Sequence, residues 1–150
     1  MRGHDHQQSS MFSYLSPEHR VRKDHPLRAI RTMADQALAA LSDRLDAMYA
    51  ATGRPSIPPE KLLRAQYSVR SERLLMEEID YRLLYRWFVG MNLDEPVWDV
   101  TVFTKNRDRL LDGDVAREFL SEVVKQAQEQ DLTSDNISQR MAHGWKPGPA

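Results

Sequence analysis

Four polar residues of the kinds that bind nucleic acid lie close together in the second half of the chain: Lys105, Asn106, Arg107 and Arg109. Their segment begins at Asp99 or Thr101, and either side chain can accept hydrogen bonds from the free N–H groups of a helix's first turn. An arginine or asparagine on such a helix can form two hydrogen bonds to one base edge, whereas lysine mainly supplies charge. The pattern predicts a DNA-binding helix. Because successive helical positions differ by about 100°, at most two or three of the four share a face with Arg109.

Another helical segment is expected just before this one, ending at Gly90. A helix, a short turn containing Pro96 and then a basic helix are typical of a helix-turn-helix, whose second helix enters the major groove while the first crosses the backbone. Arg82 and Arg86 on the first segment would then contact phosphates. Periodicity alone favours another interpretation, in which the basic segment is an ordinary solvated helix.

No other group of residues forms a recognisable chemical site. His4 and His6 are spaced like metal ligands, but no third ligand of fixed geometry accompanies them. The carboxylates in residues 77–80 have arginines at separations typical of surface ion pairs. The sequence contains no glycine-rich phosphate loop, nucleophile elbow or HExxH motif. We therefore expect neither a catalytic site nor a cofactor.

The composition is that of a soluble helical domain. The 150 residues suffice for one domain with a core, and 41% hydrophobic with 29% charged residues is ordinary for a globular chain. The net charge of −1 gives no overall attraction to nucleic acid, so DNA binding must depend on local patches. The polar N-terminus, the lack of cysteine and the lack of a long apolar run favour a cytoplasmic protein that does not contact membranes.

Hydrophobic periodicity predicts an all-α fold with four or five helices, between a solvated polar arm at residues 1–24 and a tail at residues 133–150. The expected helices are 26–52, 59–70, 71–90, 99–111 and 114–130. Their apolar stripes are expected in the core: Leu27, Ile30, Ala34, Leu41, Leu45 and Met48; Leu74, Leu75, Ile79, Leu83, Trp87 and Phe88; Val115, Phe119, Val123 and Ala127. Tyr81 and Tyr85 are interpreted as core or interface residues rather than a stacking platform.

Five blocks of the sequence resemble one known family. They are HPLR (25–28), GRPSIPPEKLLRA (53–65), YSVRSERLLMEEIDY (67–81), RWFVG (86–90) and PVWDVTVFTKNRDRLL (96–111). In this order and spacing they resemble the N-terminal domain of bacterial insertion-sequence transposases of the InsH type, a branch of the DDE transposases. The resemblance implies that residues 25–132 form a helical domain that binds the terminal inverted repeats of its element.

The same resemblance implies that catalysis is absent. In the family, two Asp and one Glu on a following domain hold two Mg²⁺ ions. That domain begins just after the segment that matches Leu132–Asp135, but here no acidic residue follows Asp135. The implied protein is a truncated fragment without strand-transfer activity, and residues 133–150 are expected to be a disordered, out-of-frame tail. Mg²⁺ is expected only for the missing domain.

A second departure from the family lies after Ala65, where about five residues of an apolar helix are missing. In a continuous helix this loss rotates the following part by roughly 140°, so Leu62 and Leu63 would no longer align with Leu74 and Leu75. The shortened helix is therefore expected to weaken the domain.

Three functions remain open at this point. The first is a DNA-binding module that competes with intact transposase at the ends of the element. The second is an interaction protein that pairs with itself or with full-length transposase and inhibits it. The third is a decayed reading frame without a stable product.

Overall fold

The computed structural model describes residues 1–5, 16–66 and 71–132. All regular structure in these ranges is helical, which confirms the predicted all-α class. The helices are α1 (Pro17–Arg20), α2 (Leu27–Ala40), α3 (Ser42–Met48), α4 (Pro59–Gln66), α5 (Glu72–Tyr81), α6 (Leu83–Val89), α7 (Val100–Asp112) and α8 (Val115–Glu129). None of these helices is long and apolar enough to cross a membrane.

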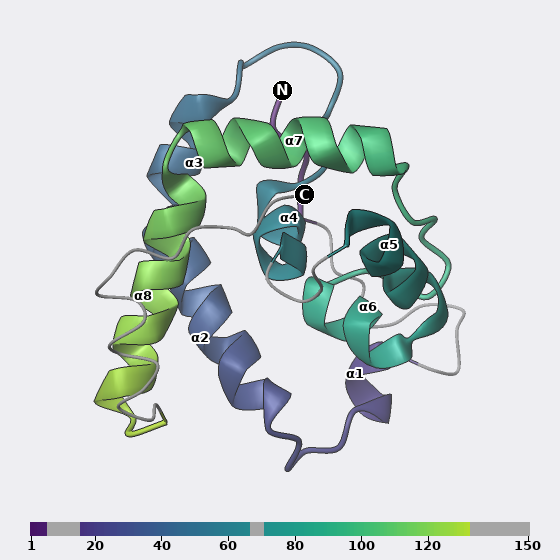
Figure 1. The fold of residues 1–150 in the computed structure, drawn as a ribbon, viewed down its shortest axis with the longest axis vertical. Helices are drawn as coiled ribbons and strands as arrows, with labels where there is room; N and C mark the ends of the chain where they lie inside the picture. Colours follow the sequence, from purple (N-terminus) through teal and green to yellow (C-terminus); the bar gives the residue numbers. More distant parts are fainter. Residues whose placement is uncertain (6–15, 67–70, 133–150) are drawn as a thin grey trace.

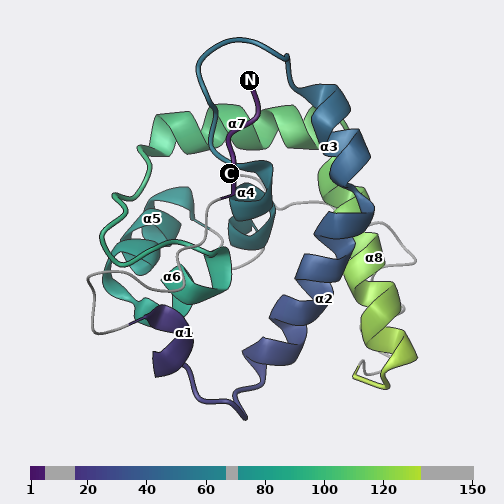
Figure 2. The same ribbon diagram turned by 180° about the vertical axis from the view of Figure 1, so that it is seen from behind.

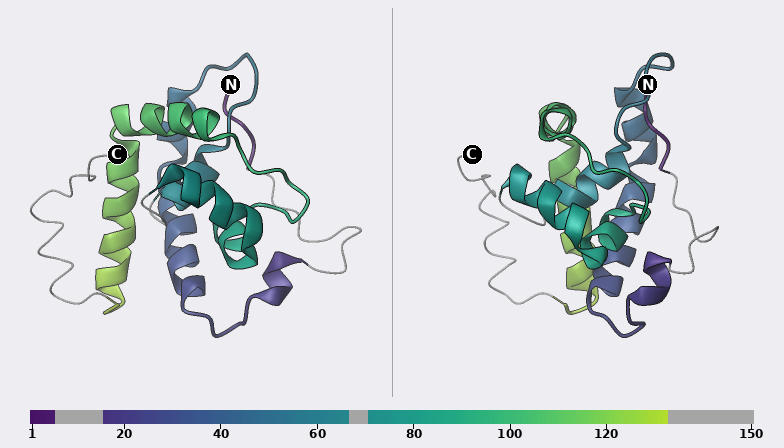
Figure 3. Two further views of the ribbon diagram at one scale, coloured as in Figure 1. Left: turned by 45° about the vertical axis from the view of Figure 1, so that its right-hand side comes forward. Right: turned by 90° about the vertical axis from the view of Figure 1, so that its right-hand side faces the viewer.

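The helices surround α4, which lies at the centre of the domain (Figures 1 and 2). Both α6 and α7 pack on α4, while α2 and α8 pack against each other along one side. α7 crosses one end of the domain and meets α8 at a corner, and α1 lies near α6 at the other end (Figures 1 and 3).

The core is built around the apolar residues of α4. Leu62, Leu63 and Ala65 are 1%, 0% and 0% exposed, and Pro59 begins the helix as predicted. Because a central helix contacts neighbours on several sides, nearly all of its side chains are buried, including the cationic Lys61 and Arg64. Residues Leu45, Ile79, Phe103, Leu110 and Val115 from the surrounding helices complete the same cluster.

Three predicted helix boundaries are confirmed by their capping contacts. The Ser71 hydroxyl accepts a hydrogen bond from the Leu74 N–H (3.4 Å), and Asp99 Oδ1 accepts one from the Thr101 N–H (2.8 Å). Gly90 ends α6 with a φ of 90°, a left-handed conformation that favours glycine.

Two of the predicted helices are each divided in the structure. The helix expected over residues 26–52 breaks at Leu41 into α2 and α3, and Ile30 of its predicted stripe is 40% exposed. The helix expected over 71–90 breaks at Arg82, whose backbone is extended (φ −112°, ψ 114°). This break turns α6 relative to α5, and Ile79 and Trp87 are both buried. Tyr81 is 82% exposed, so the interpretation of Tyr81 as a core residue is wrong.

The expected misalignment after Ala65 is only partly observed. Leu62, Leu63 and Leu75 lie in one hydrophobic cluster, while Leu74 is 45% exposed. A rotation of this kind requires one continuous helix, whereas α5 starts from its own N-cap at Ser71 and can therefore adopt its own orientation. Residues 67–70, which were predicted to extend the preceding helix, lie outside the described residues.

The N-terminal arm packs on the domain where the structure describes it. Arg2 forms ion pairs with Asp46 and Glu60, the Met1 carbonyl accepts a hydrogen bond from the Ser56 N–H (3.0 Å), and Val21 is 8% exposed. Ion pairs therefore hold residues 1–5 against the domain, and Val21 is buried. The basic stretch of the arm is solvated as predicted, because Arg20, Arg22 and Lys23 are all exposed. The predicted tail, 133–150, lies outside the described residues.

Candidate nucleic-acid interface

The rotation of α7 about its axis is fixed by two buried residues. Phe103 and Leu110 are 1% and 0% exposed, and both belong to the main core cluster. They lie about two turns apart on one side of the helix, so the opposite side faces away from the domain. The helix is thus a rigid platform for the side chains on its outer side.

Two of the four predicted helix residues lie on this outer side. Lys105 and Arg109 are exposed and are separated by one helical turn. Lys105 makes no ion pair with any described residue, and the Arg109 guanidinium lies 5.4 Å from the centre of the Tyr49 ring. This cation–π contact favours one direction for the Arg109 side chain.

The other two residues point elsewhere and make contacts within the domain. Arg107 is ion-paired with Glu72 of α5 and with Asp108, to which it is 2.9 Å away. Asn106 Nδ2 donates a hydrogen bond to the Val102 carbonyl (2.8 Å). The structure therefore brings Lys105 and Arg109 together on the outer side of α7. The side chains of Asn106 and Arg107 are instead engaged with groups of the domain itself.

The exposed side of α7 carries both signs of charge. Asp108 and Asp112 are exposed on the same helix as Lys105 and Arg109. This face is therefore close to neutral overall, and its attraction to a phosphate backbone is short-range.

The two arginines predicted to contact phosphates from the preceding segment differ in burial. The Arg82 side chain is 64% exposed and pairs with Glu78 (2.6 Å). The Arg86 side chain is 7% exposed, and its guanidinium donates hydrogen bonds to the carbonyls of Ile79, Asn92, Leu93 and Glu95. Arg86 thus holds the loop that follows α6.

The tight turn in this part of the chain lies after α7 and not before it. The connection from α6 to α7 runs from Gly90 to Asp99, which is longer than the three or four residues typical of a helix-turn-helix. Only Gly113 and Asp114 separate α7 from α8, and Asp114 has a left-handed backbone (φ 58°). On α8, Arg117 and Lys125 are exposed, and neither was among the predicted DNA-binding residues. The pair Gly113-Asp114 is typical of a turn and was the sequence signal that could have directed attention to this connection and to α8.

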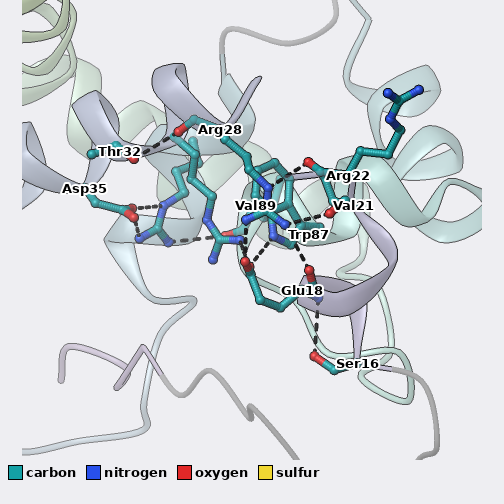
Figure 4. A network of polar contacts seen from close by, with 11 residues as sticks. Ser16, Glu18, Val21, Arg22, Arg28, Thr32, Asp35, Trp87 and Val89 are labelled. Atoms are coloured by element: carbon teal, nitrogen blue, oxygen red, sulfur yellow. Dashed lines mark hydrogen bonds and ion pairs between the residues drawn. The ribbon is translucent and has the colours of Figure 1, made fainter. Parts of the chain in front are cut away.

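A second group of cations gathers at the opposite end of the domain, where α1 meets α2 and α6 (Figure 4). The guanidinium groups of Arg28 and Arg31 lie 5.1 and 4.6 Å from the centre of the Trp87 ring. The Glu18 carboxylate accepts hydrogen bonds from Trp87 Nε1 (2.6 Å) and from Arg28, and it lies 3.5 Å from Arg31. This site could not be predicted from local sequence patterns, because its residues are far apart in the chain.

The electrostatics of this second group favour a bound anion. Burial by itself would raise the pKa of Glu18, but hydrogen bonds from Arg28 and Trp87 and the charges of Arg28 and Arg31 outweigh it and lower that pKa. Burial lowers the pKa of Arg31; the charge of Arg64 adds to this effect, while the charges of Asp35, Glu18 and Asp5 oppose it. An anion beside Arg31 therefore offsets an unfavourable concentration of buried positive charge.

Comparison with known protein families matches residues 15–109 to the family described as Transposase domain (DUF772). The match covers more than half of the 150 residues. The chain belongs to this transposase domain family. No curated protein and no solved structure matches the chain.

The boundaries of the transposase-family match can be placed on the fold. It begins just before α1 and ends at Arg109, inside α7. The matched segment therefore includes Lys105 and Arg109 as well as the group around Trp87, whereas the turn at Gly113-Asp114 and all of α8 lie beyond it. The predicted relation to transposases is confirmed at the level of the family.

Proposed function

We propose that this transposase-family domain binds DNA at the terminal inverted repeats of its element, through the outer side of α7, without cutting or joining strands itself. Membership of a transposase domain family is the observation that carries the proposal. A transposase must recognise the ends of its element, and a helical domain with exposed cations is suited to that task.

The geometry of α7 supports this assignment. A helix fits the major groove of B-DNA, and the outer side of α7 presents Lys105 and Arg109 one turn apart. Because Phe103 and Leu110 anchor the helix in the core, the backbone that carries the two cations is already ordered, and only their side chains lose conformational entropy on binding. In the proposed complex Arg109 contacts a base edge or a phosphate, Lys105 contacts a phosphate, and the exposed Arg82 adds a more distant phosphate contact.

The charge of the surface limits the affinity. Asp108 and Asp112 lie beside the two cations, and the net charge of the whole chain is −1. Such a surface neutralises few phosphates, so binding should be weak at physiological salt and steeply dependent on salt. The preference for the terminal repeat over other sequences is correspondingly modest.

We expect no strand transfer by this domain. A two-metal site needs carboxylates fixed at defined positions on rigid elements. In residues 1–5, 16–66 and 71–132, no group of three or more potential metal ligands is arranged around a common point. Incubating the purified chain with terminal-repeat DNA and Mg²⁺ or Mn²⁺ should give neither nicked nor joined products.

A binding measurement tests the proposed interface. Fluorescence anisotropy would compare a duplex carrying the terminal repeat with a shuffled duplex of equal length, at one stated salt concentration. The double variant Lys105→Ala/Arg109→Ala should weaken binding. The salt dependence of its affinity should correspond to about one to two fewer neutralised phosphates. The matched control is Arg54→Ala/Lys125→Ala, which removes two exposed cations outside α7. Equal binding by the two double variants would disprove a role for α7.

A second candidate function is supported by exposed apolar side chains on α5 and α7. Leu74 and Tyr81 of α5 are 45% and 82% exposed, and Val102 of α7 is 46% exposed. Leu74 and Tyr81 lie about two turns apart on one side of α5, which packs against α7, and apolar side chains gathered on one exposed side are typical of a protein contact. The corresponding function is pairing with itself or with full-length transposase. Association that is lost on Leu74→Ser/Tyr81→Ser, in a chain that does not bind the repeat duplex, would favour this candidate.

A further inference from the structure

We propose that Arg28, Arg31 and Trp87 form a phosphate-binding site that the Glu18 carboxylate of α1 occupies in this structure, and that a backbone phosphate of duplex DNA replaces Glu18 when α1 is displaced. The inference rests on the proposed DNA-binding function and adds a second contact, at the end of the domain opposite α7 (Figure 1).

Hydrogen-bond donors from two helices converge on one anion. Arg28 and Arg31 come from α2 and Trp87 comes from α6, and all three donate toward or lie beside the Glu18 carboxylate (Figure 4). Arginine pairs with carboxylate and phosphate oxygens through the same planar arrangement of N–H groups. A site that holds a carboxylate in this way therefore has the donors that a phosphate group requires.

The donors are held in position by their own packing. Trp87 is 3% exposed, and the side chains of Arg28 and Arg31 are 25% and 14% exposed. Stacking of both guanidinium groups on the Trp87 ring restricts their orientation. The site should therefore keep its shape when Glu18 leaves.

The element that supplies Glu18 is held mainly by polar contacts. α1 has four residues, none of them buried, and the Glu18 side chain itself is 52% exposed. Arg28 also donates hydrogen bonds to the carbonyls of Glu18 (2.9 Å), Val21 (2.6 Å) and Arg22 (2.8 Å), so the same guanidinium holds both the carboxylate and the backbone. Water or another anion can replace these polar contacts, and the only buried hydrophobic residue in this part of the described chain, 16–24, is Val21.

The charges around the site favour a replacement anion. Arg64 lies next to this group and pairs with Asp35 (2.8 Å) and Asp5 (3.3 Å). When Glu18 leaves, one negative charge is removed from beside Arg28 and Arg31. A phosphate diester carries one negative charge and restores the balance.

The test compares two carboxylate-to-amide variants of the full chain. Glu18→Gln removes the competing carboxylate from the site, and Glu118→Gln makes the same charge change in another ion pair between two helices, with Arg44. Circular dichroism first establishes that both variants keep their helix content. Glu18→Gln should bind terminal-repeat and shuffled duplexes about tenfold more tightly than the parent chain at low salt. The salt dependence of its affinity should correspond to about one more neutralised phosphate. The double variant Glu18→Gln/Arg31→Gln should lose this gain.

The outcomes separate this inference from the proposed function. An equal gain from Glu18→Gln and Glu118→Gln, or a gain that survives Arg31→Gln, would overturn the site. If no variant binds duplex, the proposed function fails, and titration with inorganic phosphate then tests the site alone through the indole N–H signal of Trp87 in nuclear magnetic resonance spectra. A phosphate-dependent shift in Glu18→Gln, absent from Glu18→Gln/Arg31→Gln, supports a site for free phosphate. The lack of such a shift excludes any phosphate site.

Discussion

Lys61, in the first turn of the central helix α4, is ion-paired with Glu95 of the loop between α6 and α7. Its Nζ atom lies 2.8 Å from Glu95 Oε1 and 2.9 Å from Oε2, and the Lys61 side chain is only 3% exposed. Glu95 also accepts a hydrogen bond from the Asn92 N–H (3.2 Å), and its carbonyl accepts one from Arg86. The loop that leads into α7 is thus attached to α4 and α6 by two buried cations.

The first prediction concerns the asymmetry of this ion pair. The Glu95 side chain is 27% exposed, so water can reach it when Lys61 is replaced, whereas Lys61 is left buried and unpaired when Glu95 is replaced. Glu95→Ala should lower the free energy of unfolding by about 3 kcal/mol, and Lys61→Met by clearly less. Urea denaturation measures both values, and an equal loss in the two variants would contradict the argument.

A second prediction distinguishes the roles of Arg86 and Arg82. Arg86→Leu removes the donor from four backbone carbonyls and should lower the free energy of unfolding by about 2 to 4 kcal/mol. Arg82→Ala breaks a single pair with Glu78 four residues away, in which Arg82 is 64% and Glu78 is 19% exposed, so its effect on stability should be smaller, about 1 kcal/mol. The same thermal or urea measurement serves both variants. Arg82→Ala should instead weaken DNA binding through the loss of one phosphate contact.

The third prediction separates Arg107 from Arg109. Arg109→Ala should weaken binding to the terminal-repeat duplex by about 1 to 3 kcal/mol if Arg109 contacts a base, because its side chain lies on the outer side of α7. Arg107→Ala should affect binding less and stability more, since Arg107 connects α7 to Glu72 of α5. Anisotropy titrations and denaturation of the same two samples give both quantities. A larger loss of affinity in Arg107→Ala would place the DNA on the other side of the helix.

Local signals explain why the helix boundaries could be predicted. Ser71, Gly90 and Asp99 each act on backbone groups within three residues of themselves, so their effect is already present in the sequence. The breaks at Leu41 and Arg82 have no such signal. At Arg82 the break accompanies the burial of both Ile79 and Trp87 on its two sides, which depends on packing with elements distant in the chain.

The candidate site was predictable only in part, because it too depends on tertiary packing. The sequence identified the cations of α7 but not which of them face outward, because that depends on how Phe103 and Leu110 enter the core. The sequence alone does not distinguish an exposed arginine from a buried one. Only its tertiary contacts distinguish Arg86 from Arg82. The group of Glu18, Arg28 and Trp87 joins three helices, and no spacing rule connects its members.

The last prediction concerns the response of α1 to pH. Three groups face the Glu18 carboxylate: Arg28 and Arg31 of α2, and Trp87 of α6. Together they lower the pKa of Glu18 below its ordinary value of 4.5, despite the opposing effect of burial. A carboxylate with a lowered pKa in the folded state stabilises the fold fully above the unfolded pKa, and this contribution is lost as the pH falls through the folded pKa. Docking of α1 should therefore be unchanged from pH 7 to about 5 and weaken below 4.5.

The indole N–H signal of Trp87 measures this change directly, because Trp87 Nε1 donates to Glu18 at 2.6 Å. The signal should move along a single titration curve with a midpoint below 4.5, while the helix content measured by circular dichroism changes little over the same range. In Glu18→Gln the curve should be absent, whereas in Glu118→Gln it should be retained, because Glu118 pairs with Arg44 far from Trp87 in the sequence and on other helices. A midpoint above 4.5, or the same curve in Glu18→Gln, would mean that Glu18 is not held by these donors in solution.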